Sequence, residues 1–318
     1  MAITIALAGN PNCGKTTLFN ALTGANQYVG NWPGVTVEKK EGKIKNKKYK
    51  KEDVTVTDLP GIYSLSPYTL EEVVSRDYLL KEKPDVIIDL VDATNIERNL
   101  YLATQLLEIG IPVVIALNMV DLLKKNNIHI NVKGLSSALG CPIVETSALK
   151  GTGLKEVVDE AIKCANQHRV PSKQMEFPKA VEKAVNEIEG FVPANIAEEN
   201  KRWYAVKLLE RDSKVKEGLN LPASAQSRIE EIASGLEKAE DDDTESIVTD
   251  GRYQYIQKVV SANVKRSGNK MTVSDKIDRI VTNRILGLPI FILTMFIVYY
   301  VSVTTVGTMV TDWTNDSF

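Results

Sequence analysis

The sequence has few of the residues that build disulfide frameworks and metal centres. Its 318 residues include three cysteines, Cys13, Cys141 and Cys164, and only two histidines. Three widely spaced cysteines match neither a disulfide framework nor a zinc motif, and they fit a reducing compartment. His129 and His168 stand alone in the sequence, which disfavours a histidine-based metal site.

The chain also lacks an excess of charge of either sign. Lys and Arg number 39 against 41 Asp and Glu, a formal net charge of −2. No overall basic field is present to attract nucleic acid, so nucleic acid is not an expected partner. The basic run Lys39–Lys51 is instead predicted to decorate the tip of a hairpin. The length is enough for roughly two domains.

One stretch lacks charge altogether. Ile285–Val310 contains no Asp, Glu, Lys or Arg. About 20 apolar residues in a helix span a bilayer, so we predict a transmembrane helix at 285–311, with a buried core helix as the alternative. The chain ends soon afterwards, which suggests truncation or a single terminal span. Basic residues in the juxtamembrane segment 271–284 predict, by the positive-inside rule, that residues 1–284 lie on the cytoplasmic side of the cell membrane; they are Lys276, Arg279 and Arg284.

The first half of the chain has the pattern of an α/β domain. Residues 1–168 alternate short apolar runs with helical patterns, which is typical of a mostly parallel sheet. We expect strands at Ile3–Ala8, Val35–Ile44, Val54–Thr57, Val86–Val91, Val113–Asn118 and Ile143–Thr146. We expect helices at Lys15–Thr23, Asn95–Ile109 and Leu154–Ala165.

From Val170 to Gly268 the strand signals disappear. Residues 169–270 are therefore predicted to form a small all-helical domain. Its acidic run, Glu240–Asp243, is interpreted as a solvated loop, with a weak divalent-cation site as the alternative. The expected helices are Ala180–Ile188, Trp203–Glu210, Ala225–Ala239 and Tyr253–Val264.

A complete phosphate-binding motif, G-x-x-x-x-G-K-[ST], lies between the first predicted strand and helix. Its backbone N–H groups and the helix N-terminus attract phosphate oxygens. Lys15 is expected to contact the β- and γ-phosphates, and the Thr16 hydroxyl to ligate Mg²⁺. Cys13 is expected to contribute its backbone, with thiol-based redox control as the alternative. The predicted phosphate-binding residues are Gly9, Asn10, Pro11, Asn12, Cys13, Gly14, Lys15, Thr16 and Thr17.

Two later motifs favour guanine over adenine. Asn118–Asp121 resembles the N-K-x-D element of GTPases, whose Asp accepts hydrogen bonds from guanine N1–H and the 2-amino group. Met119 stands where that element usually has Lys. Ser147–Leu149 matches an element whose backbone N–H meets the guanine oxygen. The predicted base-binding residues are Asn118, Met119, Asp121, Ser147, Ala148 and Leu149.

Two further elements fit nucleotide-dependent switches. Asp58–Gly61 matches D-x-x-G, in which Asp58 would hold a Mg²⁺-bound water and Gly61 would donate its N–H to the γ-phosphate. Gly34, Val35 and Thr36 follow a segment predicted to be flexible, Ala25–Pro33, and Thr36 fits the threonine that closes over Mg²⁺. Five elements in this order predict a P-loop GTPase that binds GTP or GDP with Mg²⁺.

Position 62 departs from many small GTPases. They have a glutamine there that orients the attacking water, whereas this chain has Ile62. Intrinsic hydrolysis is therefore expected to be slow or assisted in another way. Asn12 resembles the asparagine of potassium-activated GTPases, which helps to hold K⁺ beside the phosphates; a loop-stabilising asparagine is the alternative. The predicted catalytic residues are Lys15, Thr36, Gly61 and Asn12.

Four segments together resemble the ferrous iron transport protein B (FeoB) family. They are Gly9–Thr17, Asn31–Glu38, Asp58–Leu65 and Arg284–Phe291. The resemblance covers nearly the whole chain. It implies a cytoplasmic GTPase domain, a helical domain that tunes nucleotide release, and the first helix of a multi-pass Fe²⁺ transporter. The partners that it implies are the lipid bilayer, Fe²⁺, the remainder of the membrane domain and a small accessory protein.

Three other interpretations stay open at this stage. GTP occupancy, and not hydrolysis, could control the membrane part. The chain could be a membrane-tethered regulatory GTPase unrelated to iron. It could also be a soluble-type GTPase of ribosome or tRNA maturation, although the charge-free segment argues against that.

Overall fold

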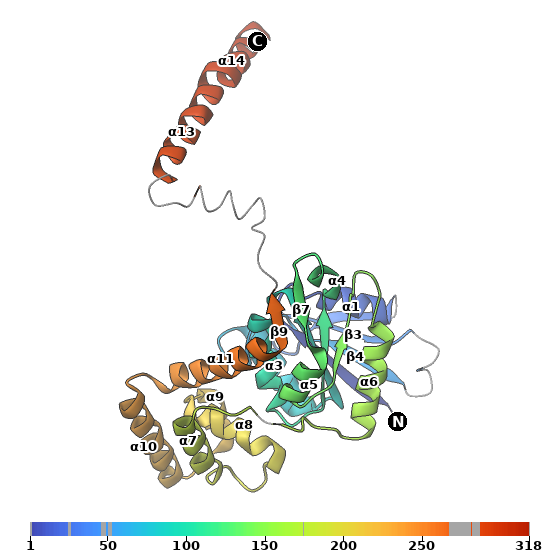
Figure 1. The fold of residues 1–318 in the computed structure, drawn as a ribbon, viewed down its shortest axis with the longest axis vertical. Helices are drawn as coiled ribbons and strands as arrows, with labels where there is room; N and C mark the ends of the chain where they lie inside the picture. The colour runs from blue at the N-terminus through green and yellow to red at the C-terminus, as the bar shows by residue number, and fades with distance from the viewer. Residues whose placement is uncertain are drawn as a thin grey trace. The chain divides into compact units, whose positions relative to one another are not determined.

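The computed structural model describes residues 2–24, 27–45, 49, 53–173, 175–266, 281 and 287–317. These residues form two compact units, divided between Lys265 and Arg266. The first unit contains a sheet and its covering helices, and the second contains an apolar helix (Figure 1). The basic residues of the predicted juxtamembrane segment lie outside the described residues; they are Lys276, Arg279 and Arg284.

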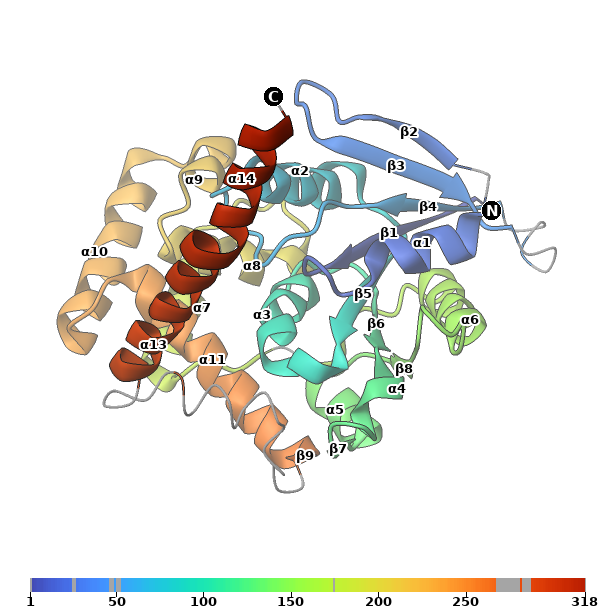
Figure 2. The ribbon, with the colours of Figure 1, turned by 90° about the horizontal axis from the view of Figure 1, so that it is seen from above.

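A seven-stranded sheet forms the centre of the first unit, in the order β2-β3-β4-β1-β5-β6-β8; Figure 2 labels these strands. The pairs from β4 to β8 are parallel, while β2 and β3 form an antiparallel edge. The mostly parallel sheet predicted from the sequence is therefore confirmed. The strands are β1 (Ile3–Gly9), β2 (Gln27–Asn31), β3 (Glu38–Lys43), β4 (Val54–Asp58), β5 (Val86–Asp92), β6 (Val113–Asn118) and β8 (Ile143–Glu145).

The antiparallel edge corrects two expectations. β2 lies inside the segment predicted to be flexible, Ala25–Pro33, of which Ala25 and Asn26 fall outside the described residues. The strand predicted from Val35 begins only at Glu38. The cause is a turn in which the Trp32 N–H donates to the Val37 carbonyl over 2.8 Å. This turn brings β2 and β3 side by side, and strand pairing then overrides a weak local pattern.

Helices cover both faces of the sheet (Figure 2). Apolar side chains of α1 (Lys15–Thr23) and α6 (Leu154–Asn166) pack into one core. Those of α3 (Ile96–Leu107) and α5 (Val132–Leu139) pack into the other. Sandwiching a parallel sheet in this way buries both of its faces. The shorter elements are α2 (Leu70–Asp77), η2 (Tyr78–Glu82), η3 (Ala93–Asn95), α4 (Val120–Leu123) and β7 (Ile128–Ile130).

The later helices continue the second of these cores. Buried residues of α7, α8, α10 and α11 belong to the same apolar cluster as those of α3 and α5. All of these helices belong to the first compact unit, together with the sheet. The expectation of no further strand is wrong at β9 (Val264–Arg266), which pairs with β7. The helices are α7 (Lys179–Glu189), α8 (Glu198–Leu209), α9 (Ser213–Leu219), α10 (Ala223–Glu240) and α11 (Thr244–Asn263).

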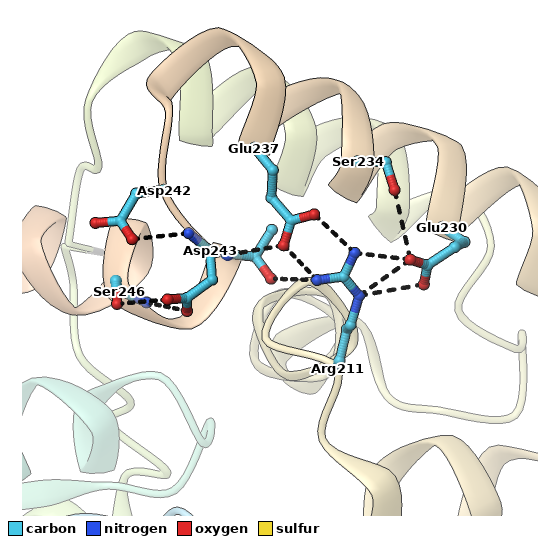
Figure 3. Close-up of polar contacts among 8 residues, drawn as sticks. Arg211, Glu230, Ser234, Glu237, Asp242, Asp243 and Ser246 are labelled. Carbon is cyan, nitrogen blue, oxygen red and sulfur yellow. Dashed lines mark hydrogen bonds and ion pairs between the residues drawn. The ribbon is translucent and has the colours of Figure 1, made fainter.

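One arginine joins the α8–α9 turn to α10 (Figure 3). The Arg211 guanidinium contacts the carboxylates of Glu230, at 2.7 Å, and Glu237. The neighbouring acidic run, Glu240–Asp243, is exposed, as predicted for a solvated loop. Its last carboxylate has a structural use, because Asp243 accepts the N–H of Ser246 over 2.9 Å and caps α11.

Two buried ion pairs connect the later helices to the sheet domain. Arg252 of α11 contacts Glu108, at the end of α3, over 2.7 Å, and both side chains are almost completely buried. Arg76 of α2 contacts Asp212, which precedes α9, also over 2.7 Å. Charges taken out of water are costly unless they are paired, so each pair fixes the contact between its two elements.

The second unit is an extended helical stretch. It comprises α13 (Gly287–Tyr300), η4 (Val301–Gly307) and α14 (Thr308–Ser317). Gly287–Thr304 has a mean hydropathy of 1.9 and is long and apolar enough to cross a membrane. Ile285 and Leu286, the predicted start of the transmembrane helix, lie outside the described residues.

The buried Arg252–Glu108 pair and the partly exposed Arg211–Glu230 pair give a stability prediction. Arg252→Met should lower the free energy of unfolding by about 3–5 kcal/mol, because it leaves Glu108 buried without its partner. The matched change Arg211→Met, at a side chain that is 38% exposed, should cost about 1 kcal/mol or less. Urea unfolding followed by tryptophan fluorescence measures both. Equal losses for the two variants would contradict this ranking.

Candidate functional site

A cleft of about 700 Å³ opens at the carboxyl ends of β1 and β6. Crevices at this edge of a parallel sheet are the usual ligand sites of α/β folds. It is lined by Asn10, Pro11, Asn12, Gly14, Lys15, Thr16, Thr17, Gly61, Asn118, Met119, Asp121, Leu122, Ser147, Ala148 and Leu149. Apart from Leu122, all were predicted from sequence motifs. The structure therefore brings the phosphate motif and both base motifs to one cleft.

The loop between β1 and α1 is shaped by backbone that few residues can adopt. Gly14 has φ +95°, and a Cβ there would lie 2.5 Å from the Asn118 Nδ2. Asn12 also has a left-handed backbone, with φ 66°, and its side chain is exposed. The first N–H groups of α1 have no partners within the helix and begin at this loop. The local geometry is that of an anion-binding site.

Asn118 ties the two ends of the cleft together. Its Nδ2 donates to the Cys13 carbonyl over 2.8 Å, and its Oδ1 accepts the Ala148 N–H at 2.9 Å. The side chain is 2% exposed. In a buried setting both hydrogen bonds are costly to lose. One side chain thus fixes the predicted phosphate loop relative to the predicted base-binding loop.

Lys15 and Asp58 lie in contact at the phosphate end. The Lys15 Nζ is 2.6 Å from Asp58 Oδ1 and also donates to the Leu59 carbonyl. Burial raises the pKa of the Asp58 carboxyl, and the charge of Lys15 acts in the opposite direction. The Thr16 side chain is exposed at the cleft. This corner therefore offers a cation, a carboxylate and a hydroxyl.

The base end is built around Asp121, at the start of α4. Hydrogen bonds from Ser147 and Lys150 hold the pKa of its carboxyl below the usual value, so it is ionised at neutral pH. Met119 lines the cleft beside it with a left-handed backbone, φ 63°. The sequence motifs did not predict Lys150 or Leu122 as site residues, because neither residue is part of a motif.

The predicted switch threonine does not line the cleft. Thr36 and Gly34 are exposed, in the turn that joins β2 to β3. Trp32, which precedes this turn, is only 7% exposed. Its ring packs edge-on against Tyr78 at 5.3 Å between centroids. The large apolar surface of the indole explains its burial.

Other predicted residues lie beneath or beside the cleft. Gly9 ends β1, Val35 is half-buried in the β2–β3 turn, and Asp58 reaches the site through Lys15. Cys13 is buried, and burial raises the pKa of its thiol to about 12, which disfavours the redox alternative. Ile62 is 2% exposed and its side chain belongs to the apolar core, so it does not face the cleft.

Family models match most of the first unit. One, described as ferrous iron transport protein B, matches residues 3–161, and another, described as the FeoB cytosolic helical domain, matches residues 177–265. The chain is 40% identical over 311 residues to an Fe(2+) transport protein A/Fe(2+) transporter FeoB fusion protein of Porphyromonas gingivalis, covering 93% of this chain and 36% of that protein. It is 39% identical over 319 residues to Fe(2+) transporter FeoB of Escherichia coli strain K12, covering 96% and 39%. The chain thus spans less than two-fifths of the length of these relatives.

Solved structures match the fold of the first unit. A GDP-bound point mutant of the S. thermophilus FeoB G-domain aligns with a TM-score of 0.79 and 47% identity, covering 83% of this chain and all of that one. The mGMPPNP-bound NFeoB of S. thermophilus aligns with a TM-score of 0.72 and 47% identity, covering 84% and 99%. These similar proteins bind guanine nucleotides.

The geometry predicts that Asp121 selects the base. Asp121→Asn should lower GTP affinity by at least about tenfold, because an amide donor would replace an ionised acceptor, whose hydrogen bonds contribute about 1.5–3 kcal/mol. Calorimetric titration with GTP measures the change. The same substitution at exposed Asp241, outside the cleft, should leave affinity unchanged. GTP affinity that is unaltered in Asp121→Asn would remove Asp121 from base recognition.

Proposed function

The chain belongs to the ferrous iron transport protein B family, and from that premise we propose that it is the GTP-hydrolysing cytoplasmic part of an Fe²⁺ transporter with its first membrane helix. The observation that carries this proposal is the cleft, in which a complete phosphate loop and the ionised Asp121 face one ligand space. The apolar Gly287–Thr304 helix supports attachment to the cell membrane, with the GTPase on the cytoplasmic side.

The donor set at the phosphate end fits Mg²⁺. Mg²⁺ prefers hard oxygen ligands and usually binds through one or two protein groups plus phosphates. The Thr16 hydroxyl of the cleft is such an oxygen, and the Asp58 carboxylate would hold a Mg²⁺-bound water. Lys15, which contacts Asp58 in this structure, would pair with phosphate. When bound, Mg²⁺ would neutralise charge on the phosphates. Thr36 would join this set only if the β2–β3 turn moved toward the cleft.

Potassium is proposed as a further cation of the same cleft, held by Asn12. The Asn12 side chain is exposed at the cleft, and its left-handed backbone sets its direction within the loop. Ile62 is buried in the core and cannot orient a water molecule. A cation beside the phosphates would stabilise the negative charge of the transition state, and so assist hydrolysis in a way that does not need a side chain at position 62.

Contacts of the residues that follow the D-x-x-G motif with helices α3 and α8 support a route for coupling. The Leu65 N–H donates to Gln105 of α3, and the Lys207 Nζ of α8 lies 3.4 Å from the Ser66 hydroxyl. Arg76 of α2 adds its buried pair with Asp212. A movement that extends from the D-x-x-G motif to Leu65 and Ser66 would alter contacts with α3 and α8, and a movement of α2 would alter the pair with Asp212. We propose that nucleotide state reaches the membrane part through these helices.

Control by occupancy is the second candidate. The burial of Ile62 favours it, because a slow enzyme can serve as a gate that hydrolysis only resets. Iron uptake by the full-length transporter in vesicles loaded with GTP or with a non-hydrolysable analogue separates the two. Equal uptake supports gating by occupancy, whereas uptake with GTP alone supports coupling to hydrolysis.

The potassium assignment gives a kinetic prediction. The chain should hydrolyse GTP faster in KCl than in NaCl at equal ionic strength, and should not hydrolyse ATP. Asn12→Ala should make the two rates equal with little change in nucleotide affinity, because only the cation ligand is lost. Steady-state phosphate release measures the rates. Stimulation that persists in Asn12→Ala would refute the assignment, and absence of hydrolysis in both salts would refute the enzymatic function.

A further inference from the structure

The carboxylate at the base end of the cleft has a cationic partner outside every motif. The Lys150 Nζ lies 3.3 Å from Asp121 Oδ2. The Asp121 side chain is only 17% exposed, whereas Lys150 is 59% exposed. Asp121 lines the cleft, and the lysine that contacts it is not among the lining residues.

The position of Lys150 is set by a closed loop. The Ser147 N–H donates to the Thr152 carbonyl at 3.0 Å, and the Thr152 N–H donates to the Ser147 carbonyl at 3.2 Å. Inside this bridge the Lys150 N–H donates to the Ser147 carbonyl at 3.1 Å. The loop is in turn anchored through Ala148 to Asn118. These hydrogen bonds hold the backbone of the loop that carries Lys150, and so place its side chain near Asp121.

The cleft brings little other positive charge to this end. Met119, where GTPases usually have a lysine, is uncharged. Lys15, which lines the cleft, contacts Asp58 at the phosphate end. Among the described residues, Lys150 is the cation found in contact with Asp121.

We propose that Lys150 is a positioning residue for guanine recognition, orienting the Asp121 carboxylate toward the base. This inference rests on the proposed base-reading role of Asp121. A carboxylate has about four lone-pair sites, so two hydrogen bonds from guanine leave room for the ammonium group. The ion pair restricts the rotation of the Asp121 side chain before the ligand arrives, which reduces the ordering cost of binding.

A double-mutant cycle tests the proposal on the full chain. GDP and xanthosine diphosphate are titrated calorimetrically into the wild type, Lys150→Met, Asp121→Asn and the double variant. Xanthine carries an oxygen where guanine has its 2-amino group, so an amide at position 121 can donate to it. Lys150→Arg tests whether the charge alone is needed. Lys155→Met removes an exposed lysine outside the cleft and serves as the matched control.

The expected result is a specific pattern. Lys150→Met should weaken GDP binding about two- to fivefold, the range that a partly exposed ion pair supplies. In the Asp121→Asn background the same substitution should change GDP affinity by less than the error, because the carboxylate is already gone. Lys150→Arg should bind GDP like the wild type, and Lys155→Met should have no effect.

Several outcomes would overturn the proposal. GDP affinity that is unchanged or tighter in Lys150→Met, or weakened equally in both backgrounds, would show that Lys150 does not act through Asp121. Failure of the base-reading role itself looks different: Asp121→Asn would then leave GDP affinity unchanged and gain no affinity for xanthosine diphosphate. Thermal unfolding of each variant separates a loss of folding from either result.

Discussion

The geometry of the cleft depends on one buried asparagine. Asn118 donates to the carbonyl of Cys13 and accepts the N–H of Ala148, so its amide spans two loops that are more than a hundred residues apart in sequence. Gly14 has to be a glycine because the same amide lies where a Cβ would be. The loop that Asn118 anchors also carries Lys150, the partner of Asp121. Phosphate binding and base selection thus share one structural support.

The helices beyond the sheet domain are joined to the nucleotide site by packing as well as by charge. Their apolar side chains belong to the same core as α3 and α5, and the buried pairs Arg252–Glu108 and Arg76–Asp212 cross the contact. A shared core is difficult to shear, since packed interiors resist small displacements. Movement of α2 or of the D-x-x-G segment would therefore have to displace these helices or break a buried ion pair. This constraint favours transmission of the nucleotide state over independent motion of two domains.

Motifs predicted most of the cleft, and tertiary contacts account for what they missed. The phosphate loop and the Asn118–Asp121 segment were readable because their chemistry needs fixed residue types at fixed spacing. β2 was missed because its five residues, Gln27–Asn31, become a strand only by pairing with β3. The burial of Trp32 depends on Tyr78, and the contact of Lys150 depends on a loop closed by Ser147 and Thr152. Such contacts join residues far apart in the sequence, and no local sequence motif marks them.

Amide hydrogen exchange on the full chain with Asn118→Ala tests this account most directly. Without the Asn118 amide, the Ala148 N–H loses its acceptor and the phosphate loop loses the donor to Cys13. The account predicts faster exchange both in peptides that cover residues 10–17 and in those that cover residues 146–152, with β5 unchanged. Faster exchange confined to one of the two loops, or in neither, would contradict the view that one side chain supports both ends of the cleft.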